Sequence, residues 1–508
     1  MNIPILHFNE EADGEPPCPL LVSGRSAPAL DLAPARAAQR NWGALPVADR
    51  MGVLRRFRSE LAANPTRFVR ALAPRDEAHV AEVLATQIIP LADACEFLER
   101  EASRLLAPRR VGRRGRPTWL AGTSAEIHRE ACGVVLVVAP SNYPLLLPGV
   151  VVLQALAAGN AVVLKPGHGG AAVARELIQA LHRSGLDPAL TVLLDEHPAG
   201  VMAALDAGVD KLVFTGGAWT GAVLLSECAS RLVPAVMELS GSDAMFVRAD
   251  ADVPLAVRAL LFGLRVNRGA TCIAPRRVFV HESRFAEFEA ECLRVFSGET
   301  AWTVPAAESP AANPTLAGLI VEAAAQGARV IAGEVDHHGH TTVPLLVAEA
   351  TPAMRLLRED HFASVAALVR VSGDDEALGF NDQCPYALGA SIFSGNPAEA
   401  RALAGRINAG SVLINDVIVP TADPRLPFGG RKQSGFGLTR GPEGLLELTN
   451  AKVVSVRRGT WRPHFAAPQP DDPEFFSQYL ALTHAPRWST RLKSALSLLR
   501  AALNRNNT

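Results

Sequence analysis

Two residues in the middle of the chain could together attack a carbonyl carbon and hydrolyse the product. Glu238 begins the sequence Glu-Leu-Ser-Gly, and Cys272 lies 34 positions later within Asn267–Pro275. A thiolate is a nucleophile, and a carboxylate can activate the water that hydrolyses a thioester. A lone cysteine is most often a buried small hydrophobe, and a lone glutamate after an apolar strand is most often a solvated strand end. The pair therefore needs support from other motifs.

The chain around these residues predicts alternating strands and helices. Gly133–Ala139 is a continuous apolar run rich in β-branched residues, which is typical of a buried parallel strand. A helix over 150–158, closed by Gly159-Asn160, and a strand over 161–164 follow. The alternation continues with expected helices at 171–184, 201–206, 221–230, 254–264 and 283–296, and with strands at 191–194, 211–214, 244–247, 277–280 and 411–415. We expect the last strand to be buried too, and the order predicts doubly wound α/β domains.

Other segments have different patterns. Helical spacing marks residues 30–106, with a break at Asn64-Pro65, and these helices are expected to cover one face of a sheet. Residues 1–30 are rich in proline and predict an irregular arm. Residues 298–313 are rich in turn-forming residues.

Composition narrows the class of protein. With 508 residues the chain is too long for one core, and 48% hydrophobic residues are enough for a large one. The formal net charge of -1 argues against nucleic acid as the main partner. Seven scattered cysteines without a C-x-x-C pair argue against a disulfide framework or a metal site, and favour a reducing compartment. No signal peptide or membrane span is evident, so we expect a cytoplasmic protein.

Seven short motifs occur in a fixed order between about residue 35 and about residue 455. Together they resemble the aldehyde dehydrogenase superfamily, and the wording around Cys272 is most similar to its fatty and aromatic aldehyde branch. The motifs are Ala139–Pro144, Leu164–Pro166, Phe214–Gly217, Glu238–Gly241, Gly269–Cys272, Glu359–Phe362 and Leu426–Gly430.

The resemblance implies an architecture of two doubly wound α/β domains with a small β arm that bridges subunits in a homodimer or homotetramer. We assign 1–110 and 131–238 to the cofactor-binding domain and 239–440 to the catalytic domain. The bridging or oligomerisation arm is expected at 111–130 and 441–460, and a C-terminal extension at 461–508.

The resemblance also implies roles for three catalytic residues. Cys272 attacks the aldehyde, and the side-chain amide of Asn142 stabilises the oxyanion together with the Cys272 backbone N–H. Glu238 then activates water to hydrolyse the thioester. Without the motif around it, Asn142 would be interpreted as a turn residue.

The cofactor implied by the resemblance is NAD or NADP. The loop Thr215–Gly221 joins an expected strand to an expected helix, where glycines let backbone amides approach a pyrophosphate. Taken alone, this loop is equally well explained as a tight turn, because its spacing is not that of the usual fingerprint. The family has two glycines five residues apart here, which are Gly216 and Gly221, with Gly217 beside the first. Lys165 matches the family lysine that holds the adenosine ribose.

Several positions depart from the family pattern. His168 stands where a glutamate often binds both ribose hydroxyls, so a 2′-phosphate is tolerated better and NADP joins NAD as a candidate. Asp360 replaces the usual glutamate at the nicotinamide ribose, whereas Phe362 retains the adjoining aromatic ring. Ser141 and Ala270 are smaller than the usual residues, which enlarges the substrate channel or lowers activity.

We predict NAD(P)-dependent oxidation of an apolar, long-chain aldehyde to the carboxylate. Two alternatives remain. Arg265 and Arg268 could bind an acidic semialdehyde, and the departures could mark a catalytically weakened scaffold or cofactor-binding subunit. A CoA-acylating enzyme would not need Glu238.

The C-terminal extension has the pattern of an amphipathic basic helix. Such a helix packs on the body or a neighbouring subunit, or makes peripheral contact with an anionic membrane. No acidic residue follows Glu474. The apolar stripe consists of Trp488, Leu492, Leu496, Leu499 and Leu503, with Arg491, Lys493 and Arg500 elsewhere.

Overall fold

The computed structural model describes residues 29–73, 76–297, 314–335, 344–460, 462–465 and 467–505. The chain forms two compact units. The first, here called the body, lies within 1–109 and 127–453, and the second, the arm unit, comprises 110–126 and 454–508. The irregular arm expected at 1–30 falls almost wholly outside the described residues, and the turn-rich segment at 298–313 falls entirely outside them.

The first sheet of the body has six strands in the order β17-β7-β6-β3-β4-β5. Strands β3 to β7 pair in parallel, and β17 joins antiparallel to β7. The chain order reverses between β3 and β6, which is where a doubly wound sheet binds its ligand, beyond the carboxyl ends of the strands. The bounds are β3 Val134–Val138, β4 Ala161–Lys165, β5 Thr191–Leu193, β6 Lys211–Thr215, β7 Ala235–Glu238 and β17 Gly435–Phe436.

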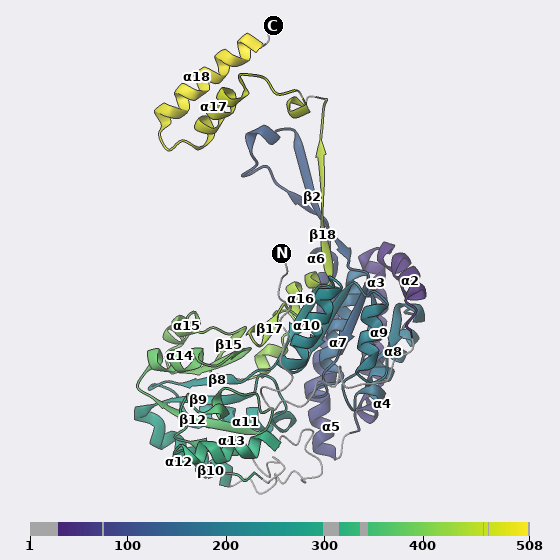
Figure 1. Ribbon diagram of the computed structural model, residues 1–508. Coiled ribbons are helices and arrows are strands. Elements are labelled where there is room, and N and C mark those ends of the chain that lie inside the picture. Colours follow the sequence, from purple (N-terminus) through teal and green to yellow (C-terminus); the bar gives the residue numbers. More distant parts are fainter. Residues whose placement is uncertain are drawn as a thin grey trace, which may run out of the picture. The chain divides into compact units, whose positions relative to one another are not determined.

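Helices pack around this sheet in the body (Figure 1). All residues of α7 (Leu146–Ala158) are buried, and Gly159 ends it in the left-handed conformation with φ of 95°, as its sequence predicts. The helical N-terminal region is also confirmed, with the break at Asn64-Pro65. The helices are α2 Ala33–Ala44, α3 Val47–Ala63, α4 Pro65–Ala71, α5 Glu77–Val83, α6 Ile89–Leu105, α8 Ala171–Arg183, α9 Ala199–Asp206 and α10 Ala218–Ser230.

The second sheet has seven strands in the order β10-β11-β12-β9-β8-β14-β15. All neighbours pair in parallel except β10 and β11. The strands are β8 Asp243–Val247, β9 Pro275–His281, β10 Arg329–Ala332, β11 Leu345–Ala348, β12 Val365–Val371, β14 Gly389–Phe393 and β15 Ser411–Ile414. The prediction that 411–415 is a buried strand is wrong on burial, because β15 lies at the sheet edge and its four residues are only half-buried.

Apolar side chains cover both faces of the second sheet, so its strands are apolar on both sides. The remaining helices of the body are α11 Val253–Arg265, α12 Glu282–Ser297, α13 Pro314–Ala325, α14 Asp374–Asp382, α15 Pro397–Ala404 and α16 Gly441–Glu447. The two mainly parallel sheets confirm the predicted α/β class. The boundary between a cofactor domain and a catalytic domain within the body stays a prediction.

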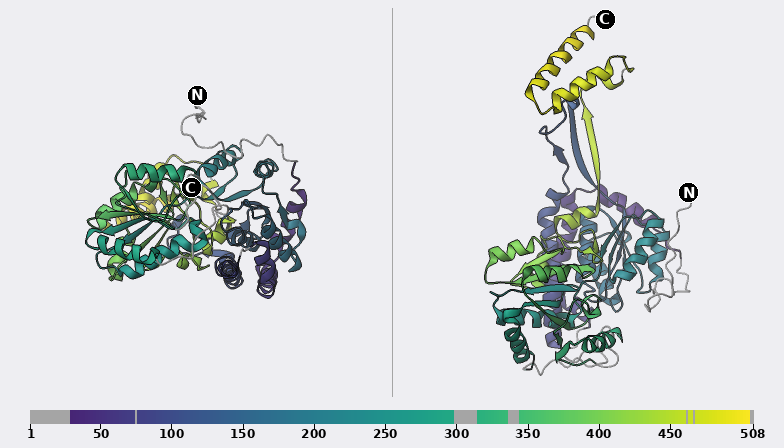
Figure 2. Two further views of the ribbon diagram at one scale, coloured as in Figure 1. Left: turned by 90° about the horizontal axis from the view of Figure 1, so that it is seen from below. Right: turned by 60° about the vertical axis from the view of Figure 1, so that its left-hand side comes forward.

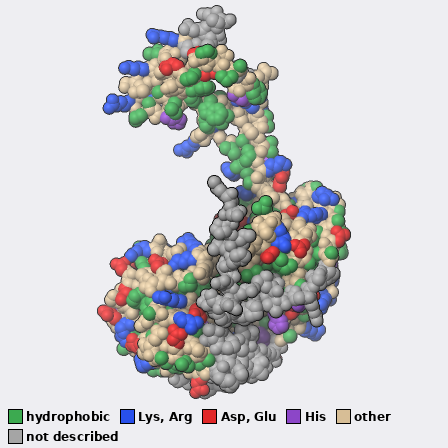
Figure 3. All heavy atoms as spheres, viewed as in Figure 1, with side chains coloured by type: hydrophobic (Ala, Val, Ile, Leu, Met, Phe, Trp, Pro, Cys, Tyr) green, Lys and Arg blue, Asp and Glu red, His purple; other side chains and the backbone are tan. Residues whose placement is uncertain are grey.

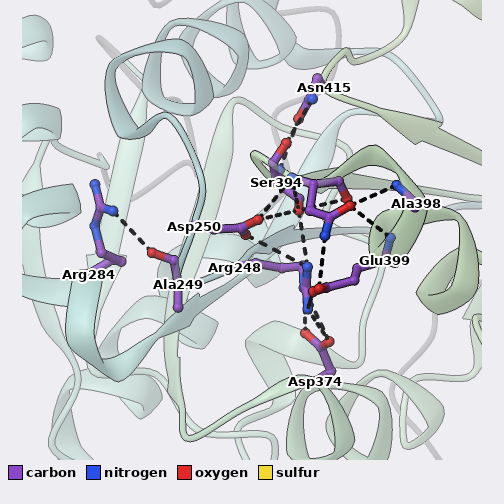
Figure 4. A network of polar contacts seen from close by, with 10 residues as sticks. Arg248, Ala249, Asp250, Arg284, Asp374, Ser394, Ala398, Glu399 and Asn415 are labelled. Carbon is purple, nitrogen blue, oxygen red and sulfur yellow. Dashed lines mark hydrogen bonds and ion pairs between the residues drawn. The ribbon is translucent and has the colours of Figure 1, made fainter.

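A polar network closes one end of the second sheet (Figure 4). Arg248 follows β8 and donates hydrogen bonds to Asp374 at 3.2 Å and to Glu399 at 2.9 Å. The Ser394 hydroxyl, just after β14, donates to Asp250 at 2.9 Å. This network ties α14 and α15 to the ends of two strands.

The arm unit contains parts of β2 (Thr123–Ala131) and β18 (Thr449–Arg457), which form a three-stranded sheet with β1 (Arg109–Val111). It ends in two helices, α17 (Asp472–His484) and α18 (Trp488–Arg505), which pack side by side (Figure 2). Within this unit the Thr118 hydroxyl is hydrogen-bonded to the Tyr479 hydroxyl. The predicted C-terminal helix is therefore present.

Candidate active site

The loop that presents Cys272 has an unusual backbone. Asn267, Arg268 and Gly269 have φ values of 46°, 55° and 74°, all in the left-handed region. For a residue other than glycine this conformation costs about 1 kcal/mol or more. A Cβ at Gly269 would lie 2.6 Å from the Ser364 Cα, so glycine is required there. The loop therefore depends on contacts outside itself.

Asn267 supplies several of these contacts. Its side-chain Nδ2 donates to the Asn142 carbonyl at 2.8 Å and to the Ala270 carbonyl at 3.1 Å, and its backbone N–H donates to Glu82. The Asn142 Nδ2 donates to the same Ala270 carbonyl at 3.0 Å. The Asn142 side chain is thereby fixed to the backbone of Ala270, two residues before Cys272. Its amide has a second N–H that can donate to another acceptor.

Glu238 is the last residue of β7, and its side chain is almost completely buried. Gly435 of β17 lies opposite it in an antiparallel pair. The loop that precedes β17 also fixes the segment after Glu238, because the Ser434 hydroxyl donates to the Ser240 carbonyl at 2.6 Å. The carboxylate therefore sits on a rigid strand end.

Gly241 brings the Glu238 segment against the nucleophile loop. A Cβ at this position would lie 2.2 Å from the Cys272 carbonyl oxygen. Burial raises the pKa of the Cys272 thiol, and the charge of Glu238 raises that pKa further. The segment that carries the carboxylate and the loop that carries the thiol thus pack against each other at Gly241.

Burial also raises the pKa of Glu238, against the opposing effects of Arg440 and a hydrogen bond with Thr439. Its Oε1 atom has no hydrogen-bond partner within the described part of the chain. A buried carboxylate oxygen without a partner is rare in proteins and calls for an explanation. Here it is an available proton acceptor.

Arg276 is a site residue that the sequence interpretation missed. It is 1% exposed, and its Nη2 atom donates to the carbonyls of Gly269 at 3.0 Å and Thr271 at 3.3 Å. Its Nη1 atom donates to the Ala363 carbonyl. The signal was available, because two arginines open an otherwise apolar strand at 276 and 277. The residue clamps the nucleophile loop to the segment that follows Phe362.

Arg440 was also missed. Its positive charge lowers the pKa values of both Glu238 and Cys272, although burial outweighs it at each. Its guanidinium lies 4.7 Å from the centre of the Phe428 ring, and its Nη1 donates to the Thr421 carbonyl at 2.7 Å. Only its position ten residues after the motif Leu426–Gly430 pointed to it.

The residues predicted to hold the adenosine ribose lie together. Lys165 ends β4, and burial lowers its pKa while Glu196 and Asp195 oppose that change. His168 is fully exposed, and its Nδ1 lies 3.7 Å from a Glu196 oxygen. Glu196 was missed because it comes from a different loop, which follows β5.

Glu196 occupies the amides at the start of α8. Its two carboxylate oxygens accept from the N–H groups of Gly169 at 2.9 Å and Ala171 at 2.7 Å. Burial alone would raise the pKa of Glu196, but these hydrogen bonds and the charges of His168 and Lys165 lower it. The carboxylate is therefore ionised at neutral pH.

The predicted glycine loop joins β6 to α10. Gly216 and Gly221 are tightly packed, since a Cβ would meet Phe214 at 2.4 Å or Leu239 at 2.4 Å. At Gly217, in contrast, a Cβ would meet nothing within 4 Å. The loop thus has one open position at a helix N-terminus, at the carboxyl end of a parallel strand, which suits a pyrophosphate.

Asp360 and Phe362 lie beside the loop that presents Cys272. The Phe362 backbone N–H donates to Asp360 Oδ1 at 3.0 Å. The Phe362 ring centre is 5.8 Å from the Arg276 guanidinium. The described contacts therefore place the predicted cofactor residues in two groups, at the ribose end and near Cys272.

From the sequence, Ser141 is expected to enlarge the substrate channel or lower activity, and Arg265 and Arg268 are considered as binding residues for an acidic semialdehyde. Ser141 is exposed, and Arg265 and Arg268 are half-exposed and already have interaction partners. Across the described residues, no group of three His, Cys, Asp or Glu side chains is arranged to hold a metal ion.

Comparison with known proteins identifies the family. The model of the aldehyde dehydrogenase family matches residues 26–454. The chain belongs to the aldehyde dehydrogenase family. It is therefore an oxidoreductase with the fold of that family, as its motifs predict.

Individual relatives of this aldehyde dehydrogenase differ in their named substrates. The 4,4′-diapolycopene aldehyde oxidase of Methylomonas is 32% identical over 87% of this chain and 86% of its own length. A Mycolicibacterium smegmatis protein named “putative succinate-semialdehyde dehydrogenase”, with NADP(+) in its name, is 30% identical over 85% of this chain and 84% of its own. The NADP complex of an NADP-dependent glyceraldehyde-3-phosphate dehydrogenase from Bacillus halodurans has a TM-score of 0.75 at 27% identity, covering 84% and 90% of the two chains.

The contacts of Asn267 generate a prediction. Asn267→Asp keeps the shape of the side chain but removes both of its donated hydrogen bonds. We expect kcat/KM to fall about tenfold to a hundredfold, because Asn142 and Cys272 lose their common support. Steady-state kinetics and melting temperatures of the two proteins measure this.

Asn408→Asp is the matched control, since the Asn408 oxygen accepts from Arg431 and an aspartate keeps that contact. This variant should retain wild-type kinetics. A wild-type kcat/KM for Asn267→Asp would show that the loop does not depend on Asn267.

Proposed function

We propose that this enzyme oxidises an apolar aldehyde to the carboxylate with NAD or NADP. The observation that carries the proposal is the buried Glu238, which has one oxygen without a partner among the described residues and lies on a segment that packs against Cys272 at Gly241. A thiol and a proton acceptor placed together can form and then hydrolyse a thioester. A catalytically weakened scaffold would have no use for this pair.

In the proposed reaction Cys272 is the nucleophile, Glu238 the base and Asn142 a donor to the oxyanion. Glu238 accepts the thiol proton as the Cys272 sulfur attacks the aldehyde carbon, giving a thiohemiacetal. The free N–H of the Asn142 amide and the Cys272 backbone N–H stabilise the oxyanion. Loss of hydride from the thiohemiacetal carbon leaves a thioester on the sulfur, and Glu238 passes the proton it took from the thiol to solvent. The ionised carboxylate then removes a proton from the water that hydrolyses the thioester. The net change converts aldehyde and water into carboxylate, one hydride and two protons.

The nicotinamide cofactor supplies the acceptor for that hydride. The residues proposed to hold it are Lys165 at the adenosine ribose, Gly217 with its neighbours Gly216 and Gly221 at the pyrophosphate, and Asp360 with Phe362 at the nicotinamide end. The open space at Gly217 and the strand ends around it fit such a ligand.

The apolar substrate class is supported by a small cavity that Arg440 lines and that Cys272, Glu238 and Asn142 do not. Apart from this arginine, its lining is almost entirely apolar. It comprises Pro90, Ala94, Phe97, Leu98, Leu146, Val150, Gln154, Ala422, Pro424, Arg440 and Gly441. The named substrate of the Methylomonas relative supports this class, and that of the mycobacterial relative supports the alternative of an acidic semialdehyde. Because Arg265 and Arg268 already have partners, we favour the apolar aldehyde.

We also propose an oligomeric state and a cellular compartment for the enzyme. Val453, Val454 and Val456 of β18 are exposed, which supports a homodimer or homotetramer joined through this strand. The described cysteines are all free thiols, which supports a reducing compartment such as the cytoplasm.

The cofactor preference is proposed to depend on Glu196. This carboxylate stands beside His168 and occupies two backbone N–H groups at the start of α8. It also adds a negative charge that repels a phosphate. Although His168 by itself tolerates NADP, Glu196 restores the charge that favours NAD.

The activity test uses aldehydes from short to long chain, with a succinate-type semialdehyde included, and follows reduction of NAD and NADP by absorbance. We expect turnover to improve with chain length and to rise with pH, because ionisation of Glu238 follows its raised pKa. Cys272→Ala should lower turnover at least about a thousandfold.

Cys132→Ala, at another half-buried thiol, is the control and should stay active. Preference for the semialdehyde would support the acidic alternative. No reduction of either cofactor with any aldehyde would support the scaffold.

The cofactor test compares NAD and NADP in Glu196→Gln. Glutamine keeps the size of the side chain and removes its charge, so kcat/KM for NADP relative to NAD should rise about tenfold. Asp195→Asn removes an adjacent charge that does not occupy the α8 amides, and it should change the ratio much less. Equal ratios in wild type and Glu196→Gln would contradict this role, whereas a merely structural role would lower both values together.

A further inference from the structure

The outward face of α18 is apolar and exposed. Trp488, Leu492, Leu496 and Leu499 are 81%, 65%, 53% and 60% exposed, whereas Ser494 on another side of the helix is 3% exposed. These four residues follow helical spacing and form one stripe, here called the α18 stripe. The side chain of Leu503 lies outside the described residues. Within the described part of the arm unit, these four side chains are therefore left uncovered.

The second terminal helix adds to the apolar surface. Phe476 and Leu480 of α17 lie one turn apart, and each is 61% exposed. Figure 3 shows apolar and basic side chains gathered over these helices. Large exposed apolar patches with a polar rim mark interaction sites in soluble proteins.

The arm unit and the rest of the chain have net charges of opposite sign. Its residues, 110–126 and 454–508, include 12 Lys and Arg against 4 Asp and Glu, a net charge of +8. Since the whole chain carries -1, the remainder carries -9. From residue 475 to the end there are five basic residues and no acidic one. The helices that expose the stripe therefore lie in the most basic part of the chain.

Basic residues flank the α18 stripe on both sides. By helical position, Lys493 and Arg500 lie on one flank and Arg491 lies on the other. The Arg491 guanidinium is 5.7 Å from the Trp488 ring centre. Long basic side chains at such positions can extend their charges to phosphates while their stems cover apolar surface.

We propose that α18, assisted by α17, binds to the surface of an anionic lipid bilayer. The stripe enters the boundary between headgroups and acyl chains, and the flanking basic residues pair with lipid phosphates. None of the helices in the described part of the chain has the length and apolar character to cross a bilayer, so this contact is peripheral. The inference is independent of the proposed function and rests only on the arm unit.

The test is co-sedimentation of the full-length protein with vesicles. One set contains equal parts of phosphatidylglycerol and phosphatidylcholine, and the other contains phosphatidylcholine alone. We expect at least about tenfold more protein to pellet with the anionic vesicles, and the difference to shrink at high salt. Equal pelleting with the two sets, or none with either, would overturn the proposal.

Matched double variants separate insertion of the stripe from simple charge attraction. Leu492→Glu with Leu496→Glu places two charges in the stripe, and Thr490→Glu with Ser497→Glu places two charges on the same helix away from it. We expect the first pair to reduce binding about tenfold more than the second. Equal losses would show that the stripe does not insert.

A second copy of the chain is the competing occupant of the stripe. Light scattering without lipid tests this, because a subunit contact would make the first pair of substitutions lower the oligomer mass. That result, with no vesicle binding by the wild type, would replace the membrane by a second copy. Unchanged mass and aldehyde oxidation in both variants are expected.

Discussion

The active site depends on hydrogen bonds that hold three consecutive left-handed residues ahead of Cys272. Asn267 and Arg268 adopt this conformation without the freedom of glycine, and Gly269 is pressed against the backbone at Ser364. Such a turn is stable only where the surrounding structure fixes it. The Asn267 amide and the buried Arg276 do this from two sides. Placement of the nucleophile is therefore a property of both large sheets of the body and the loops at their ends.

A second constraint follows from burial. Burial of Glu238 and partial burial of Cys272 raise the pKa of each and make the negative charge of either group costly. In this site the Glu238 carboxylate can accept the proton of the thiol and, after releasing it, a proton of the water that hydrolyses the thioester. Arg440 moderates the charge without neutralising it. A single carboxylate can thus act in both halves of the proposed reaction.

Much of the fold could be predicted because its strands are short apolar runs between turns, as at Gly133–Ala139. The same property caused the error at 411–415, since an apolar run does not show whether its strand is central or at an edge. Cys272, Glu238 and Asn142 could be found because their motifs occur in a known order. Their roles remain predictions, supported by the geometry.

The sequence marks Arg276 as unusual in an apolar strand, but the partners of Arg276 and Glu196 could not be assigned from it, because they are set by tertiary contacts. Glu196 lies 27 residues from Gly169 and reaches it only because β4 and β5 are neighbours. For this reason His168 alone did not reveal the charge of Glu196 beside it. Charged residues next to a strand or a loop motif are the signal to examine in such chains.

The most direct test of the roles of Cys272 and Glu238 is intact-protein mass spectrometry of Glu238→Gln mixed with a long-chain aldehyde and NAD. We predict a slowed but stoichiometric release of reduced cofactor and an adduct on Cys272 with the mass of the aldehyde less two hydrogens. Without the carboxylate the thiol attacks more slowly, and the thioester, once formed, is not hydrolysed. The wild type should show little adduct at steady state. A burst without an adduct, or an adduct on another cysteine, would contradict the assignment of Cys272 and Glu238.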